Sequence, residues 1–400
     1  MTALFVLTVW LLAVASAYPP LYPKSSKSSC RPFGNGTVNI ASYQLYPENV
    51  DFDEQSCLLC KLRRRSDIGA LYNASVVVYD PYKASVVSTI EFANITRTVP
   101  FHIGGVAWDP YTSSSKHGAK PADEITILVD AAQAHETAGR DVSGDNYIIR
   151  WDAIAHEILW SVNLTTVTRG RYGGPQDIEH DDRGNIYVLG TYPGTLLRVS
   201  GDGSAVKEWY VPPPSSRGGR NGTIDHEVLG YTGLAAVDGS TLLVSDARNR
   251  SADGGALYRF DMSAARGVPT LVPIAYPSAN ASASDVIRPG DAIYLPPKYD
   301  NEVLLITEHD AGVSVLRSRA RGAAKENKWR SAEFLGRIPN PPDVAASGAV
   351  VTAAVEIAGS VFMVEEWFTD PLVPGTSAGN RTLFPLVDIT AQLDALVKPR

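Results

Sequence analysis

The sequence predicts an all-β protein, a six-bladed β-propeller built from four-stranded antiparallel blades. Three observations predict this fold. One order of four short strands recurs along the chain, the recurrences are nearly equal in length, and no helical periodicity separates them. Repeated meanders of this kind close into a ring, because radial repetition leaves only short and protected sheet edges.

The clearest copy of the repeat lies between Gly174 and Val211. It has four runs rich in β-branched and aromatic residues, and turns that contain glycine and aspartate separate these runs. The runs cover residues 174–181, 184–189, 195–199 and 205–211. Together they predict one four-stranded meander.

The other copies follow the same order, and one of them has its fourth run at residues 270–274. The matched inner strands begin at Asn49, Gly105, Gln176, Gly233, Asp291 and Thr352, at spacings of 56, 71, 57, 58 and 61 residues. The last copy lacks an outer strand, whereas a strand-like segment at residues 38–45 precedes the first copy. We expect this segment to complete the last blade and close the ring, so that residues 18–400 form a single domain.

The N-terminus has the pattern of a secretory signal peptide. An apolar run over residues 3–15 leads to Ala15-Ser16-Ala17, so we expect a signal peptide over residues 1–17. The run is too short for a spanning helix, which needs about 20 residues, and no later stretch is long and apolar enough. We expect no membrane insertion and a location outside the cell or in the lumen of the secretory pathway. Candidate glycosylation sequons occur at Asn35, Asn73, Asn94, Asn163, Asn221, Asn249, Asn280 and Asn380.

The three cysteines lie before or within the first blade, at Cys30, Cys57 and Cys60. In an oxidising compartment this predicts one disulfide, from Cys30 to Cys57 or to Cys60. A metal site at Cys57 and Cys60 would need further Cys or His ligands at suitable spacing, and the sequence has none nearby.

Charge and motifs exclude several function classes. A net charge of −7 argues against nucleic acid as a partner, and the basic run at residues 61–65 has no interleaved aromatic residues. The chain has no Gly-x-Ser-x-Gly elbow, no His-Glu-x-x-His motif and no glycine-rich phosphate loop. Serine-hydrolase, zinc-protease and nucleotide chemistry are therefore not expected.

The candidate site is the hub, because the innermost strand of each propeller blade begins near the central channel. The candidates for proton transfer and charge stabilisation are His102, Arg288, Asp177 and Tyr231. The candidates for substrate contact are Glu48, Phe101, Tyr172, Gln176, Thr232 and Trp367. Asp291 at an inner-strand start also belongs to this face, and the ends of the second strands add Tyr192, Asp246, Glu308, His309 and Glu365. Every one of these residues also has a structural interpretation, as a turn cap, a tie between blades or aromatic packing.

The segment Asp177-Ile-Glu-His-Asp181 with the following Asp182-Arg-Gly-Asn-Ile-Tyr-Val188 resembles the superfamily of calcium-dependent lactonases, gluconolactonases and strictosidine synthases. This resemblance implies a six-bladed propeller. In the lactonases it also implies a hub metal held by a Glu, middle-repeat Asn residues and an Asp. Glu48 matches the Glu, but Gln176 and Thr232 stand in the middle repeats, and Asp291 follows Gly290 instead of preceding a glycine. We therefore expect no essential metal and no cofactor.

A narrower resemblance rests on the signal peptide, the early cysteines, the opening Pro47-Glu-Asn-Val-Asp51 and the ending Glu365-Glu-Trp367. These features resemble secreted fungal propellers of secondary-metabolite pathways, among them a trichothecene-cluster propeller and the hetero-Diels-Alderases of tropolonic sesquiterpenoid pathways. The resemblance implies a cyclisation without metal. A tropolone- or phenol-derived quinone methide would be captured by a humulene-type terpene, so the partners would be small apolar or aromatic molecules. A metal-dependent lactonase or esterase and a non-catalytic binding propeller remain the alternatives.

Overall fold

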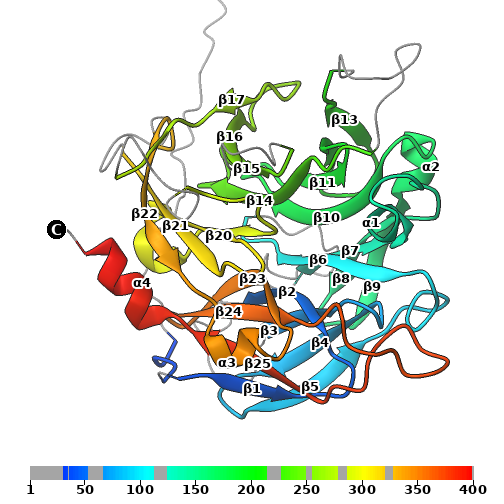
Figure 1. The fold of residues 1–400 in the computed structure, drawn as a ribbon. Helices are drawn as coiled ribbons and strands as arrows, with labels where there is room; N and C mark the ends of the chain where they lie inside the picture. Colours follow the sequence, from blue (N-terminus) through cyan, green and yellow to red (C-terminus); the bar gives the residue numbers. More distant parts are fainter. Residues whose placement is uncertain are drawn as a thin grey trace, which may run out of the picture.

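The protein is a ring of six β-sheets around a central axis, as the sequence predicts (Figure 1). The computed structural model describes residues 30–34, 36–52, 66–111, 124–213, 227–248, 255–277, 286–319 and 328–398. The predicted signal peptide and the sequons at Asn35, Asn221, Asn249 and Asn280 lie outside these ranges.

Each blade runs from an inner strand at the hub to an outer strand at the rim, and sequential strands pair antiparallel. Blade 1 is β2 (Pro47–Phe52), β3 (Ser66–Ala70), β4 (Ser75–Asp80) and β5 (Ser85–Ile90). Blade 2 is β6 (His102–Trp108), β7 (Glu124–Asp130), β8 (Tyr147–Asp152) and β9 (Glu157–Asn163). Blade 3 is β10 (Gly173–His180), β11 (Ile186–Tyr192), β12 (Thr195–Val199) and β13 (Val206–Tyr210).

The second half of the ring repeats this order. Blade 4 is β14 (Tyr231–Val237), β15 (Thr241–Asp246), β16 (Ala256–Asp261) and β17 (Thr270–Leu271). Blade 5 is β19 (Ile293–Tyr294), β20 (Val303–Thr307), β21 (Val313–Ser318) and β22 (Ala332–Ile338), with β18 (Ile274–Ala275) added at its edge. Blade 6 is β23 (Val350–Ile357), β24 (Ser360–Glu366), β25 (Leu383–Asp388) and β1 (Val38–Ala41).

The two ends of the chain close the ring, which confirms the predicted pairing. β1 runs antiparallel to β25, with Val38 opposite Leu386 and Ala41 opposite Leu383, and the two strands lie side by side in Figure 1. The strand ends at Ala41, earlier than expected, because the chain turns at Gln44, whose φ is +56°.

The outer edge of blade 4 differs from the prediction at residues 270–274. Only Thr270 and Leu271 pair within blade 4, and Ile274 belongs to β18, which pairs parallel with β22 of blade 5. Pro273 separates the two short strands because it has no N–H for a ladder hydrogen bond. Its carbonyl instead accepts the Ala332 N–H of blade 5.

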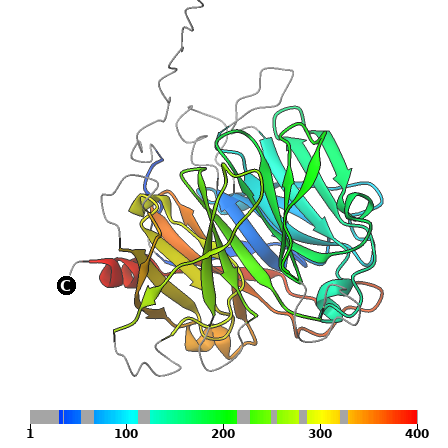
Figure 2. The same ribbon diagram turned by 90° about the horizontal axis from the view of Figure 1, so that it is seen from above.

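Apolar contacts between neighbouring blades form the core. The second strands, such as β7, β11 and β24, are buried on both faces, because a neighbouring blade covers each face. The helical segments are short, and they are α1 (Gln133–Glu136), α2 (Leu164–Thr168), η2 (Pro297–Tyr299), α3 (Pro342–Ala345) and α4 (Thr390–Val397). The turned view shows α4 at the outer edge of the ring (Figure 2), where it contacts β21, β22 and β24. Within the described ranges, no helix combines the length and apolarity that crossing a membrane requires.

Candidate functional site at the propeller hub

The inner strands carry a repeated irregularity where they begin. In five of them a β-bulge adds one residue at this end, and a bulge turns the extra side chain away from the regular alternation of the strand. The added residues are Glu48, Gly104, Gln176, Thr232 and Thr352. In blade 5, Asp291 takes the matching place, since its N–H bonds to Thr307 O at 2.8 Å. These bulge positions form a ring around the channel.

Gly104 is the member of this ring without a side chain, and close packing explains it. A Cβ at this position would lie 2.5 Å from Pro175 O and 3.3 Å from the Gln176 Cα. The glycine therefore allows the inner strands of blades 2 and 3 to approach each other.

A hydrogen-bonded layer crosses the channel at this level. The Gln176 Nε2 of blade 3 donates to Asp291 Oδ1 of blade 5, and Thr191 Oγ1 donates to Gln176 Oε1 at 2.7 Å. The second Asp291 oxygen is 3.0 Å from His309 Nε2. We call Glu48, Gln176, Asp291 and His309 the hub layer.

His309 lies in the turn between β20 and β21 with a φ of +46°, which is uncommon for a residue other than glycine. The neighbouring Glu308 holds this turn in place. Its carboxylate accepts the Arg288 backbone N–H at 2.7 Å and the Arg337 Nε at 2.7 Å. The hydrogen bond to Asp291 raises the pKa of His309 above its usual value, against the opposing effect of burial. A fixed turn thus presents an imidazole that is still about half exposed.

Glu48 contributes a carboxyl to the hub layer. Its Oε2 is shut off from solvent and has no hydrogen-bond partner among the described residues. Burial, followed by the negative charges of Asp291 and Glu366, raises the pKa of Glu48 well above its usual range. This environment favours the neutral carboxylic acid. Tyr72 lies near Glu48 and Glu366. Burial, followed by the charges of these two residues, raises the pKa of Tyr72.

A cavity of about 340 Å³ lies beside the inner strands. It is further along these strands, toward their C-terminal ends, than the hub layer. We call it the lower chamber. Asp51, Asp177 and Glu179 line it, together with Phe52, Trp108 and Tyr294. Burial raises the pKa of Asp177 to about 7 and that of Glu179 to about 8.

The lower-chamber carboxylates tie neighbouring blades together. Asp177 accepts the backbone N–H groups of Ile178 at 2.8 Å and of Leu234 at 2.7 Å. Asp51 does the same for Phe52 and for Trp108 of blade 2, both at 2.8 Å. Both oxygens of Asp177 are engaged in this way, which gives this predicted catalytic residue a structural task.

The structure brings part of the predicted site together. Glu48, Gln176 and Thr232 stand in the ring of bulge residues, and Asp177 follows Gln176 directly. His102 begins β6 on the side where the inner strands begin, which we call the mouth, and its ring lies edge-on to Tyr72 at 5.3 Å. Burial lowers the pKa of His102.

The other predicted residues take part in aromatic packing or lie on a connection between blades. Tyr231 is 0% exposed and stacks on Tyr210 at 5.7 Å, and Trp367 is 3% exposed and donates its Nε1 proton to Ser347. Phe101 packs against Tyr147, with ring centroids 6.0 Å apart. The Arg288 side chain is exposed on the connection between blades 4 and 5.

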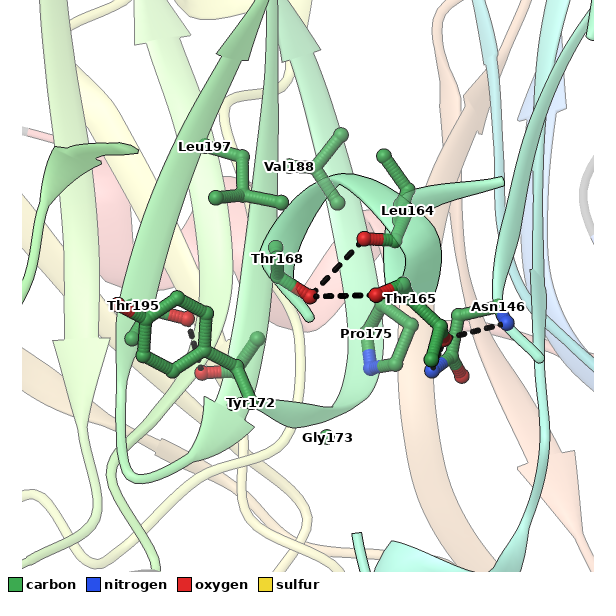
Figure 3. Close-up of a pocket in the computed structure, with 11 residues that line it drawn as sticks. Asn146, Leu164, Thr165, Thr168, Tyr172, Gly173, Pro175, Val188, Thr195 and Leu197 are labelled. Carbon is green, nitrogen blue, oxygen red and sulfur yellow. Dashed lines mark hydrogen bonds between the residues drawn. The ribbon is translucent and has the colours of Figure 1, made fainter. Parts of the chain in front are cut away.

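Tyr172 lines a small pocket between blades 2 and 3 (Figure 3). The close-up shows threonine side chains bonded to backbone carbonyls there, such as Thr168 Oγ1 to Leu164 O and Thr195 Oγ1 to Gly190 O. The accessible volume is only about 20 Å³, room for a single water molecule. This pocket is therefore part of the packing between blades.

Sequence reasoning missed several residues that face the hub, namely Asp51, Tyr72, Asp130, Glu179 and Glu366. A signal for two of them existed in the repeat. Asp51 and Glu179 occupy matched places, each two residues beyond the residue that resumes pairing after the bulge. Tyr72 and Glu366 come from second-strand ends, where the repeat gave no common residue type.

Two relatives span nearly the whole chain. "Trichothecene biosynthesis protein 14" of Trichoderma arundinaceum is 31% identical over 380 residues, 92% of this chain and 92% of the relative. "Core trichothecene cluster (CTC) protein 14" of Fusarium sporotrichioides is 27% identical over 386 residues, 94% of this chain and 90% of the relative. They confirm the resemblance to a trichothecene-cluster propeller, whereas the resemblance to hetero-Diels-Alderases stays a prediction.

Among solved structures, the major allergen Mala s 1 of Malassezia sympodialis matches with a TM-score of 0.65 and 19% identity, over 89% of this chain and 96% of the allergen. At this identity the likeness concerns the fold alone. No family model matches the sequence. The identity to the Trichoderma relative over almost the full length shows that the chain belongs to the family of trichothecene-cluster protein 14.

Proposed function

We propose that this protein is a secondary-metabolite enzyme that closes a ring on a small oxygenated terpenoid or aromatic substrate, with loss of water, at the propeller hub. One observation carries the proposal: the buried Oε2 of Glu48 has no hydrogen-bond partner among the described residues, burial favours its protonated form, and Glu48 stands in the same hub layer as the hydrogen-bonded pair of Asp291 and His309. Family membership supports a role in secondary metabolism.

The chemistry needs one proton donor and one proton acceptor. Departure of a hydroxyl group as water requires a donor, and burial raises the pKa of Glu48 so that its protonated form is favoured for this role. Removal of a proton from a ring hydroxyl leaves a reactive quinone methide. An intermolecular hetero-Diels-Alder reaction with a humulene-type polyene then forms the new C–C and C–O bonds without further proton transfer.

Most of the remaining rate acceleration would come from orienting the two reactants and from keeping water out of the site. Holding two reactants in a reactive geometry is worth about 7–11 kcal/mol, and exclusion of water protects a quinone methide from hydration. Tyr72 and Phe101 at the mouth offer aromatic surface to an apolar substrate. Arg288 and His102 are the predicted polar anchors.

The test is to incubate the purified protein with a hydroxymethyl tropolone or phenol and a humulene-type polyene, and to follow adduct formation and its stereochemical ratio. We expect acceleration over the background rate. In His102→Ala the rate should fall by about 10²- to 10⁴-fold if this residue assists proton transfer, and Arg288→Ala should change binding or the stereochemical ratio. A rate equal to background with the native protein would rule out the cyclisation.

The same assay in the presence of EDTA distinguishes this proposal from a metal-dependent lactonase. Cyclisation by the hub layer should persist in EDTA. If EDTA abolished turnover and calcium or zinc restored it, the lactonase function would replace cyclisation. Saturable binding of both substrates without turnover would instead indicate a binding propeller.

A further inference from the structure

We propose that His309 is the proton acceptor of the hub, that Asp291 and Gln176 hold its ring in the reactive tautomer, and that Glu48 is the matching proton donor. This inference rests on the proposed function and assigns its catalytic groups. His309 and Glu48 are catalytic residues in this scheme, and Asp291 and Gln176 are positioning residues.

The hydrogen bonds determine the tautomer of His309. The Asp291 carboxylate can only accept a hydrogen bond while ionised, so the His309 Nε2 at 3.0 Å must carry the proton. The lone pair of the neutral ring is then on Nδ1. Gln176 donates from Nε2 to the other Asp291 oxygen and is itself fixed by Thr191, so Asp291 cannot turn away from His309.

The backbone and its contacts fix the position of this imidazole. A positive φ at a residue other than glycine is strained, and such strain persists where the surrounding contacts fix it. Glu308 supplies those contacts by accepting the Arg288 N–H and the Arg337 Nε. His309 keeps 52% of its side chain exposed while Asp291 keeps only 8%, so the imidazole is the accessible member of the pair.

His309 fits the role of base better than His102. No carboxylate hydrogen bond orients the His102 ring in the described contacts, and its ring lies edge-on to Tyr72. Burial lowers the pKa of His102, whereas the Asp291 hydrogen bond raises the pKa of His309. A higher pKa makes His309 the stronger base.

The surroundings of His309 also indicate which part of the substrate lies beside it. The Phe368 ring is edge-on to the imidazole at 6.3 Å, and Phe368 is 46% exposed. Exposed apolar surface next to a polar group suits an amphiphilic ligand. We place the oxygenated ring of the substrate in the hub layer and its hydrocarbon part against Phe368.

His309 and Glu48 act together in the loss of water. His309 Nδ1 takes the proton of the ring hydroxyl, and the ring electrons move to expel the hydroxyl of the hydroxymethyl group. That hydroxyl takes the Glu48 proton and leaves as water. Imidazolium and Glu48 carboxylate remain, and one proton passed from His309 to Glu48 through solvent restores the starting state.

The first test does not depend on turnover. Titration of the histidine ring resonances by NMR should give His309 a pKa above that of an ordinary histidine, and Asp291→Asn should lower it. The charged and titratable groups that act on His309 are Asp291 and Asp310, so Asp310→Asn provides the comparison and should have the smaller effect. An unchanged His309 titration in Asp291→Asn would overturn the pairing.

The second test uses the cyclisation assay. His309→Ala and Glu48→Gln should each lower the rate about 10²- to 10⁴-fold, and Asp291→Asn should lower it and shift the low-pH limb of the rate profile to lower pH. His156→Ala is the matched control, because His156 is an exposed turn histidine with a φ of +57° on another blade. Wild-type rates in folded His309→Ala would overturn the assignment. A native protein without activity would instead remove the proposed cyclisation, and the NMR titration would still decide the pairing.

Discussion

Asp177 in blade 3 accepts a hydrogen bond from the backbone N–H of Leu234 in blade 4, at 2.7 Å. The same carboxylate accepts the N–H of Ile178 at 2.8 Å, so one side chain fixes two inner strands at the point where they leave the ring of bulge residues. The hub layer lies directly beside this tie. The geometry of the hub layer therefore depends on the hydrogen bonds of a neighbouring carboxylate.

We expect Asp177→Ala to destabilise the fold, because two buried N–H groups lose their acceptor. Each buried unsatisfied donor costs about 1–3 kcal/mol. Urea unfolding should show this loss in the free energy of unfolding. The exposed Asp343→Ala should leave the midpoint near that of the native protein. Equal midpoints in both variants would show that the Asp177 tie contributes nothing to stability.

Glu179 should make stability fall as pH rises. Burial, then the charge of Asp177, raises the pKa of Glu179 to about 8 in the folded state, from an ordinary value of 4.5. Between these values the folded state holds a proton that the unfolded state has lost. The contribution of Glu179 to the free energy of unfolding is therefore complete below pH 4.5 and declines toward pH 8. The stability of the native protein relative to Glu179→Gln should therefore fall across this window. A difference independent of pH would contradict the buried neutral carboxyl.

His180 should act in the opposite direction. Its Nε2 lies 2.9 Å from Thr126 Oγ1 and 3.2 Å from Arg150 Nη1, within a buried cluster in which Arg150 pairs with Asp109 and Glu124. Burial lowers the pKa of His180 to about 4 from 6.5. The folded state therefore favours the neutral ring, and its contribution is present above pH 6.5 and lost toward pH 4.

The shift of His180 corresponds to about 3 kcal/mol at 1.36 kcal/mol per pKa unit. Denaturation between pH 4 and 7 should show the native protein losing stability relative to His180→Gln as the pH falls. Parallel pH curves for the two proteins would mean that His180 titrates normally.

The disulfide remains a prediction. Cys30 is 7% exposed and belongs to the core cluster that joins blades 6 and 1, whereas Cys57 and Cys60 lie outside the described residues. Peptide mapping without reduction should find Cys30 linked to one of them, and Cys30→Ser should lower stability by about 2–4 kcal/mol. Recovery of Cys30 as a free thiol would end this expectation.

The remaining sequons can be ranked by structure. Asn94 and Asn380 are exposed, whereas Asn73 and Asn163 use their Nδ2 groups to donate to Gln44 O and Asp145 Oδ1. Glycosylation replaces one of the two Nδ2 hydrogens, so at these two sites only the hydrogen that is not in the hydrogen bond is free to be replaced. The sequence motif is identical at all four sites, so only the surroundings separate them.

The sequence by itself determined the number of blades, the places of the inner strands to within two or three residues, and the closure of the ring by β1 and β25. These features are encoded locally, because each run of β-branched and aromatic residues between turn residues specifies a strand, and a repeated strand order specifies a repeated blade. Only the tertiary structure decided which side chains meet at the hub. Gln176 and Asp291 are 115 positions apart, and His309 is on a turn that no motif marks. In three blades the residue added by the bulge lies one position before the inner-strand start that the repeat predicted. A shift of one residue turns a strand side chain to the opposite face of the sheet, so the repeat alone does not identify the side chain that enters the hub.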